Sequence, residues 1–227
     1  MIYLDYTANT PADPDVLDAY LAAERRYIAN PNSTHFAGQE ARAEMERVTQ
    51  SIAQHLGVQP AEIIYTSGAS EANNLALKGI AHASRHIGKH IISTQLEHSS
   101  VGASLSALQQ QGYEIDMLDI GRDGRVDLDQ LRKLMRDDTI LVAVCAVDSE
   151  LGTIQPIREI AGIVKPYPGC RLHVDATQAI REMSASVPVI AVSAYAYEKD
   201  KIAAIESGCN EFLTKPVSAD LLKMTIN

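Results

Sequence analysis

The chain has 227 residues, of which 46% are apolar and 22% are charged, with a formal net charge of −9 and a pI near 5.2. This composition is that of a globular protein and argues against disorder, and the length suffices for one sizeable α/β domain or two small ones. The acidic charge argues against nucleic acid or an anionic membrane as a partner. No apolar run approaches the roughly 18–20 residues of a membrane span, and the N-terminus lacks a signal-peptide layout, so we expect a cytosolic protein.

Two stretches in the first 60 residues have the apolar spacing of helices, at residues 16–21 and 45–56, with a loop of turn-forming residues at 30–38 between them. Strand patterns then alternate with helix patterns, which is typical of a parallel sheet covered by helices, so the predicted fold class is α/β. The expected strands are residues 62–67, 90–95, 114–120, 140–147 and 172–176. The expected helices are residues 70–83, 99–112, 127–135 and 156–167.

The pattern continues after Gln178 without a Gly/Ser/Pro linker. It predicts a strand at 188–194, a helix at 198–208, a short strand at 211–216 and a helix at 218–226. We therefore expect the boundary between the first and second parts of the chain, near residues 178–184, to lie within one sheet and not in a hinge between two domains.

The three cysteines are widely spaced and odd in number, which argues against a disulfide framework or a zinc site. Cys145 lies in an apolar run, and we expect it and Cys209 to be packing residues. Cys170, between Gly169 and Arg171, leaves a reactive thiol open as an alternative.

The segment TSGASEANN, residues 66–74, is typical of a tight glycine turn followed by a helix. Such a turn points backbone N–H groups at an anion, and the helix dipole adds to the attraction. Ser70 can donate its hydroxyl to a phosphate. The alternative is an ordinary turn in which Ser70 caps the helix.

Three further polar features follow expected strands, at the edge where open α/β sheets bind ligands. His98 can stack on a cofactor ring or serve only the structure. Asp175 emerges from a buried strand and needs a partner, which a protonated pyridine nitrogen would supply; the alternative is a turn cap. Gln178 can donate to a ring oxygen. The polar loop at 147–156 follows the most apolar strand.

Together these residues resemble the class V aminotransferase and cysteine desulfurase family, which binds pyridoxal phosphate (PLP) on a fold-type-I large domain. The resemblance covers residues 1–180 and includes the blocks YLDYTANTPADPDVL, NPNSTHFAGQEAR and EIIYTSGASEANNLALKG. It implies PLP as the cofactor. It also implies roles for single residues: Ala69 and Ser70 hold the phosphate, His98 stacks on the ring, Asp175 meets the pyridine nitrogen, Gln178 meets the ring hydroxyl, and Ser149 replaces an Asn that contacts the cofactor in many members.

The sequence departs from the family at the covalent lysine. Family members end a further strand in Ser-x-His-Lys, and that lysine forms the Schiff base. Here Ser193 begins the corresponding run, but Tyr195 and Ala196 stand where His and Lys belong. Lys199 and Lys201 follow as weak substitutes. The resemblance also ends before the family's small C-terminal domain, which carries the catalytic cysteine.

Residues 181–227 resemble the C-terminal half of a response-regulator receiver domain, a flavodoxin-like fold. A strand that ends in Ser193 and a run that ends in Lys215 and Pro216 carry this resemblance. It implies that Ser193 and Lys215 contact a phosphoryl group on an aspartate. Asp175 lies at a strand end near that position, but no receiver-like first half with its magnesium-binding acidic pair is present.

The sequence thus predicts a chimera of a PLP-transferase-like segment, residues 1–180, and a receiver-like β-α-β-α segment, residues 181–227, that completes the same sheet. The predicted function is a PLP-binding scaffold that lacks the Schiff-base lysine and catalytic cysteine, binds PLP weakly and non-covalently, and has no efficient catalysis. Alternatives are an inert chimera, an active desulfurase or aminotransferase using Lys199 or Lys201, and a phosphorelay module. We expect a homodimer or a monomer that tends to associate, because residues near the N-terminus are expected to leave an apolar patch: Tyr3, Leu4, Leu17, Tyr20 and Leu21.

Overall fold

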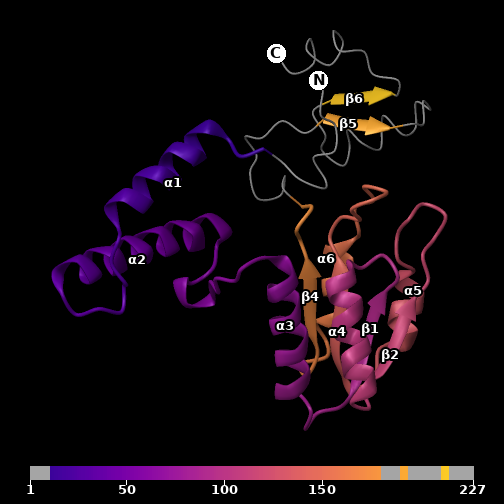
Figure 1. Ribbon diagram of the computed structural model, residues 1–227. Coiled ribbons are helices and arrows are strands. Elements are labelled where there is room, and N and C mark those ends of the chain that lie inside the picture. Colours follow the sequence, from indigo (N-terminus) through magenta and orange to yellow (C-terminus); the bar gives the residue numbers. More distant parts are fainter. Residues whose placement is uncertain (1–10, 180–189, 194–210, 215–227) are drawn as a thin grey trace. The chain divides into compact units, whose positions relative to one another are not determined.

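The computed structural model describes residues 11–179, 190–193 and 211–214. The chain divides into two compact units, Met1–Tyr65 and Thr66–Asn227. Figure 1 labels their helices and strands.

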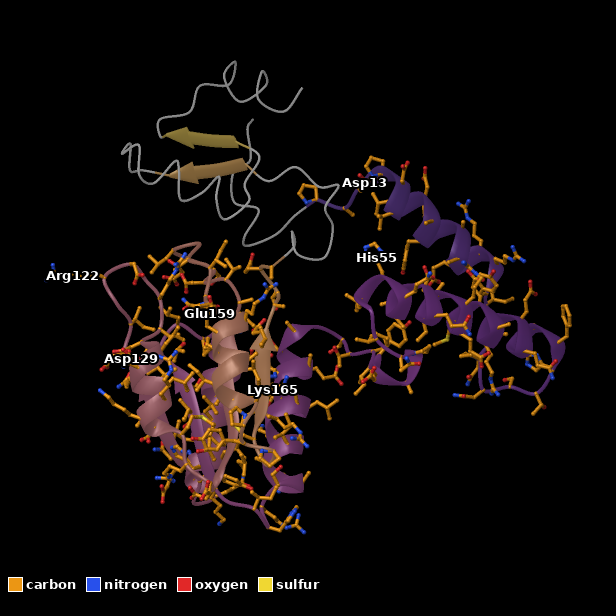
Figure 2. The ribbon with its side chains drawn as sticks, turned by 180° about the vertical axis from the view of Figure 1, so that it is seen from behind. Asp13, His55, Arg122, Asp129, Glu159 and Lys165 are labelled. Carbon is orange, nitrogen blue, oxygen red and sulfur yellow. The ribbon has the colours of Figure 1, made fainter. Side chains whose placement is uncertain are left out.

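The first unit contains both helices expected from the apolar spacing, α1 (Pro14–Arg26) and α2 (Phe36–Leu56), followed by a 3₁₀ turn, η1 (Pro60–Glu62). Asp13, which Figure 2 labels, caps α1 by accepting a hydrogen bond from the backbone N–H of Asp15 at 2.8 Å. None of the residues of α1 is buried. The helix therefore presents its apolar face, which includes the patch residues Leu17, Tyr20 and Leu21, to solvent.

The strand expected at residues 62–67 is wrong. Glu62 ends η1, and residues 63–66 form neither helix nor strand. The side chains of Ile64 and Tyr65 are 71% and 57% exposed. A run of β-forming residues is a strand only where another strand accepts its backbone hydrogen bonds, and among the described residues none pairs with this segment.

The second unit contains a four-stranded sheet with strand order β2-β1-β3-β4 and only parallel pairs. This confirms the predicted α/β class. Each of its strands matches a predicted one: β1 (His90–Thr94), β2 (Glu114–Leu118), β3 (Thr139–Cys145) and β4 (Arg171–Asp175). The helices before and between them were also predicted: α3 (Ala69–Ala83), α4 (Ser99–Gln110), α5 (Leu128–Leu134) and α6 (Ile157–Val164).

Helices cover both faces of this sheet, so alternate side chains of the central strands enter different cores (Figure 1). Ile91 and Leu141 pack with apolar residues of α3 and α4. Ile92 and Val142 pack with residues of α5 and α6. All four side chains are fully buried, and burial of each contributes about 1.5–3 kcal/mol. The continuous apolar run of β3 follows from this, because both of its faces are covered.

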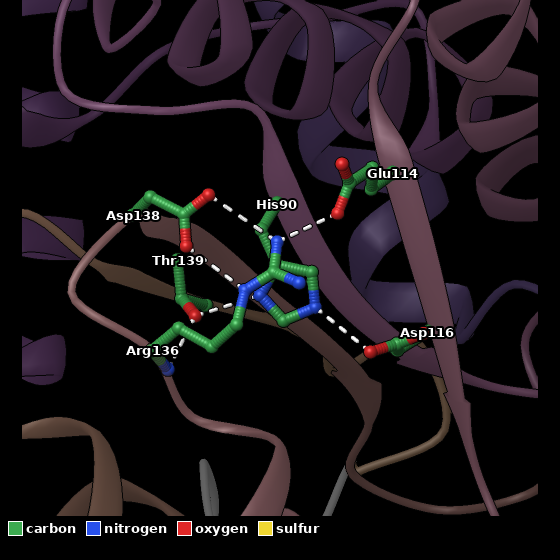
Figure 3. A network of polar contacts seen from close by, with 6 residues as sticks. All are labelled: His90, Glu114, Asp116, Arg136, Asp138 and Thr139. Atoms are coloured by element: carbon green, nitrogen blue, oxygen red, sulfur yellow. Dashed lines mark hydrogen bonds and ion pairs between the residues drawn. The ribbon is translucent and has the colours of Figure 1, made fainter.

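A polar network fastens the amino ends of β1, β2 and β3 (Figure 3). The Thr139 hydroxyl accepts a hydrogen bond from the Arg136 backbone N–H at 2.9 Å and lies 2.7 Å from His90 Nδ1. His90 Nε2 then donates to Asp116 at 3.1 Å. The Arg136 guanidinium donates to two further carboxylates, those of Glu114 and Asp138. The fully buried His90 is thus satisfied without a ligand.

Two short strands are described after residue 180, β5 (Ile190–Ser193) and β6 (Glu211–Thr214). They pair in parallel, with Ser193 opposite Thr214, and confirm the strands expected at 188–194 and 211–216. The helices expected at 198–208 and 218–226 lie outside the described residues. A flavodoxin-like half that completes the main sheet stays a prediction.

Candidate functional site

The candidate site lies at the carboxyl edge of the four-stranded sheet. The chain passes from β1 outward to β2 and then returns to β3 on the other side of β1, so the winding direction reverses between β1 and β3. Ligands of open α/β sheets bind outside the carboxyl ends of strands at such a reversal. The helices α3 and α4 also begin at this edge, where the arrowheads of the strands lie in Figure 1.

Asp175, the last residue of β4, is buried at this edge. One carboxylate oxygen accepts hydrogen bonds from the backbone N–H of Thr177 at 3.1 Å and from its hydroxyl at 2.5 Å. The other accepts one from the amide of Asn73 at 2.9 Å. Burial acts to raise the pKa of Asp175, but these hydrogen bonds and the nearby His173 outweigh it and hold the pKa below its ordinary value. Asp175 is therefore ionised, and it also caps a turn, as the alternative interpretation proposed.

Asn73 on α3 contacts three side chains, two from β4 and one from α4. Its amide donates to Asp175 and, at 3.0 Å, to the hydroxyl of Ser100 at the start of α4. Its oxygen lies 3.0 Å from Nε2 of His173 on β4. Sequence reasoning missed Asn73, His173 and Ser100. A signal was present, because Asn73 stands one turn before Leu77 on the buried stripe of α3, where a polar residue needs partners.

His98 is the N-cap of α4, and its side chain is exposed at the edge. Its Nδ1 accepts a hydrogen bond from the backbone N–H of Ser100 at 3.2 Å and lies 2.8 Å from the Ser100 hydroxyl. The capping bond gives His98 the structural role considered as the alternative. It also orients an imidazole ring at the carboxyl edge, where the ring-stacking role was predicted.

The N-terminus of α3 has the form of an anion site. Gly68 is its N-cap, so the alternative in which Ser70 caps the helix is wrong. Ala69 and Ser70 begin the helix and are exposed, which leaves their backbone N–H groups in the first turn without intrahelical acceptors. Glu71 instead secures the entering chain, since its carboxylate accepts hydrogen bonds from both the backbone N–H and the hydroxyl of Ser67 at 2.6 Å.

Glu97, which sequence reasoning also missed, occupies the reversal between β1 and β3. Its Oε1 accepts hydrogen bonds from the Thr94 hydroxyl at 2.8 Å and from the Cys145 backbone N–H at 2.7 Å. Its Oε2 is buried and has no hydrogen-bond partner among the described residues. Burial, aided by the charge of Asp175, raises the pKa of Glu97 to about 7.

The remaining predicted residues are less closely tied to this network. Ser149 is exposed in the loop after β3, whose turn is held by Asp148 through the backbone N–H groups of Glu150 and Leu151. Gln178 is half-buried just beyond Asp175. Ser193 ends β5. Three predicted lysines lie outside the described residues: Lys199, Lys201 and Lys215.

The cysteines of the second unit are packing residues where the structure describes them. Cys145 and Cys170 are buried. Burial raises the pKa of Cys145 to about 12, together with the nearby Glu97, and raises that of Cys170 to about 11. The reactive thiol considered at Cys170 is therefore wrong, because the nucleophile is the thiolate. Cys209 lies outside the described residues.

Within the described ranges, no helix is both long and apolar enough to cross a membrane. The same ranges contain no group of three or more His, Cys, Asp or Glu residues arranged to hold a metal ion.

Known proteins resemble this chain over most of its length. The mitochondrial cysteine desulfurase of Arabidopsis thaliana is 43% identical over 187 residues, which is 82% of this chain and 41% of that protein. Cysteine desulfurase IscS of Dictyoglomus turgidum is 39% identical over 84% of this chain and 48% of its own length. The solved structure of a NifS-like protein superposes with a TM-score of 0.74 at 36% identity, over 76% of this chain and 48% of that one. The chain thus spans less than half the length of these relatives.

A family model described as aminotransferase class-V matches residues 2–205. The match continues past the predicted boundary at residue 180, into the segment for which we predicted a receiver-like fold. The receiver-like character of residues 181–227 stays a prediction. Because the family model covers most of the sequence, the chain belongs to the class-V aminotransferase family.

Proposed function

We propose that the chain is a cysteine desulfurase-like scaffold that binds PLP at the carboxyl edge of its sheet. The observation that carries this proposal is the environment of Asp175. Its ionised carboxylate accepts hydrogen bonds from neutral donors of Asn73 and Thr177, and the oxygen bonded to Asn73 retains capacity for another. A protonated pyridine nitrogen supplies the positive charge and the N–H that such a carboxylate favours.

Other residues at this edge fit the rest of the cofactor. The first turn of α3, with Ala69 and Ser70, suits the phosphate because its backbone N–H groups and dipole attract an anion. The exposed ring of His98 offers a flat surface for stacking, and Gln178 an amide for the ring hydroxyl. Ser149, in the loop after β3, is a shorter replacement for the family's Asn.

PLP supplies an electron sink for carbanions when bound. Asp175 preserves that capacity by keeping the pyridine nitrogen protonated. The residue that would bind PLP covalently is absent at its family position, where Ala196 stands. We therefore propose reversible, weak binding without efficient catalysis. Lys199 and Lys201 are the substitutes whose use would restore covalent binding and an active desulfurase or aminotransferase.

The proposal is tested by titrating the purified chain with PLP, then reducing with borohydride and mapping the peptides by mass. We expect saturable binding without a stoichiometric lysine adduct. Asp175→Asn is expected to weaken binding, because a neutral amide does not stabilise the pyridinium. The matched control is Asp129→Asn on α5, labelled in Figure 2, which makes the same change at a highly exposed carboxylate.

Each other outcome points to a different function. Stoichiometric labelling of Lys199 or Lys201 contradicts the non-covalent proposal and supports an enzyme. The absence of any saturable binding contradicts PLP binding and favours an inert fold. A hydroxylamine-labile phosphoryl group on Asp175 after treatment with acetyl phosphate and magnesium would support the phosphorelay alternative. A cytosolic location and a homodimer stay predictions.

A further inference from the structure

The side chains around Asn73 form one chain of hydrogen bonds whose proton positions follow from their partners. Asp175 is ionised and only accepts, so the Asn73 atom 2.9 Å away is the amide nitrogen. The second N–H of that amide donates to the Ser100 hydroxyl at 3.0 Å. The Asn73 oxygen is left to accept from His173, 3.0 Å away, which places the hydrogen of that imidazole on Nε2.

The same reasoning extends to His98. The Ser100 hydroxyl accepts from Asn73, so its own proton is available to His98 Nδ1 at 2.8 Å. The backbone N–H of Ser100 also donates to that nitrogen, at 3.2 Å. His98 Nδ1 accepts from the backbone N–H of Ser100, and this bond favours the tautomer with the hydrogen on Nε2.

We propose that Asn73 is a positioning residue that holds Asp175 in place and, through the Ser100 hydroxyl, reinforces the His98 tautomer that the backbone N–H of Ser100 also favours. The inference rests on the proposed function for its purpose, since these are the two side chains assigned to the cofactor ring. A single amide therefore fixes the group that meets the pyridine nitrogen and the ring that stacks on it. Asn73 is 4% exposed, and both of its N–H groups and its oxygen form hydrogen bonds with Asp175, Ser100 and His173.

Asn74 provides a matched control on the same helix. Its amide donates to the backbone oxygen of Ser70 at 2.9 Å, and its oxygen accepts from Lys78 at 2.6 Å. It has the same side chain one position along, and both of these bonds stay within α3. A purely structural requirement for asparagine in this helix predicts similar effects at both positions, whereas a positioning role predicts effects at Asn73 alone.

The first experiment needs no cofactor. Nitrogen-15 histidine labelling and long-range proton–nitrogen spectra report the tautomer of His98 in the folded chain. We expect the Nε2–H form in the parent and a mixture in Asn73→Leu, which keeps the volume but removes the donors. Ser100→Ala removes the hydroxyl that lies between Asn73 and His98, and is expected to shift the tautomer while leaving Asp175 its bond from Asn73. Asn74→Ala should match the parent.

The second experiment measures PLP dissociation constants against pH. Among the described residues, the titratable groups that interact with Asp175 are His173 on β4 and Glu97 after β1. We expect Asn73→Leu to weaken binding about tenfold at pH 7, as for loss of one hydrogen bond to a charged group. The acid limb of the profile, where affinity falls as Asp175 is protonated, should also move to higher pH. Ser100→Ala should leave that limb in place.

The two proposals fail separately. If the parent does not bind PLP, the proposed function is wrong, and the tautomer spectra alone decide the role of Asn73. If folded Asn73→Leu and Ser100→Ala both keep the parent's His98 tautomer, the positioning role is wrong whatever the affinity for PLP. Circular dichroism checks the fold of each variant, and Ser100→Ala decides the matter if Asn73→Leu does not fold.

Discussion

Glu97 Oε1 accepts a hydrogen bond from the backbone N–H of Cys145 at 2.7 Å, so a carboxyl group that follows β1 closes the carboxyl end of β3. The contact bridges the point at which the winding of the sheet reverses. It is made by a group whose pKa is raised to about 7 by burial and by Asp175. Stability and protonation are therefore coupled at the edge assigned to the cofactor.

This coupling predicts a pH dependence with a definite sign. The folded chain retains a proton on Glu97 between its ordinary pKa of 4.5 and about 7, whereas the unfolded chain releases it. The stabilisation is complete below pH 4.5 and is lost as the pH rises through about 7. We expect Glu97→Gln, measured by urea unfolding, to remove this decline and to be more stable above pH 7 by on the order of 1–3 kcal/mol.

Glu71→Gln is the control for that measurement. Hydrogen bonds from Ser67 lower the pKa of Glu71, so its neutralisation should give no stabilisation above pH 7. A Glu97→Gln variant that follows the pH profile of the parent would contradict the raised pKa.

Alanine substitutions at two glycines of the second unit should change the unfolding free energy in opposite directions. A Cβ at Gly88 would clash with the backbone oxygen of Asp138, so Gly88→Ala should cost about 2–4 kcal/mol of unfolding free energy. A Cβ at Gly79, inside α3, meets nothing within 4 Å, so Gly79→Ala should stabilise by about 0.5–1 kcal/mol. Thermal and urea unfolding measure both, and equal effects would contradict the close approach at Gly88.

The two buried cysteines should resist alkylation in the folded chain. A pKa of about 11 rather than 9 at Cys170 lowers the thiolate fraction about 100-fold, and the pKa of Cys145 is higher still. We expect iodoacetamide to label both far more slowly at pH 8 than it does in concentrated urea, with peptide mapping to distinguish them from Cys209. Rapid labelling of Cys170 under native conditions would restore the reactive-thiol interpretation.

The exposed apolar face of α1 predicts self-association. Leu17 and Leu21 are 49% and 48% exposed, and Tyr20 lies between them at 61%. Light scattering should show a mass that rises with concentration in the parent. Leu17→Gln with Leu21→Gln should reduce this rise, whereas Glu24→Gln on the same helix should not. A monomer across a wide concentration range would contradict association through this face.

Sequence patterns predicted the helices and strands correctly where the burial of side chains decides which element forms. The run at 140–147 is apolar on both faces because helices cover both sides of β3, and the pattern states this directly. The run at 62–67 has similar β-forming residues, but its side chains at Ile64 and Tyr65 remain exposed. A residue pattern records a preference for burial and cannot supply the neighbouring strand that a sheet requires.

The site was predictable in part for a related reason. Asp175 and His98 follow strands, and the carboxyl ends of parallel strands meet at one edge, so their proximity follows from the fold class. Asn73 and Glu97 act through partners that lie 102 and 48 residues away in the chain. Such pairings depend on strand order, which the alternation of strands and helices leaves undetermined.

The parallel pairing of the sheet also sets an order of assembly. Each parallel strand joins its neighbour only after the intervening helical connection has closed, and that loop closure costs entropy before the contacts repay it. During synthesis, β1, β2 and β3 emerge and can pair while β4 is still in the ribosome. Asp175 meets Asn73 only when β4 docks, so a ligand that depends on Asp175 stabilises the finished sheet and none of the intermediates before it.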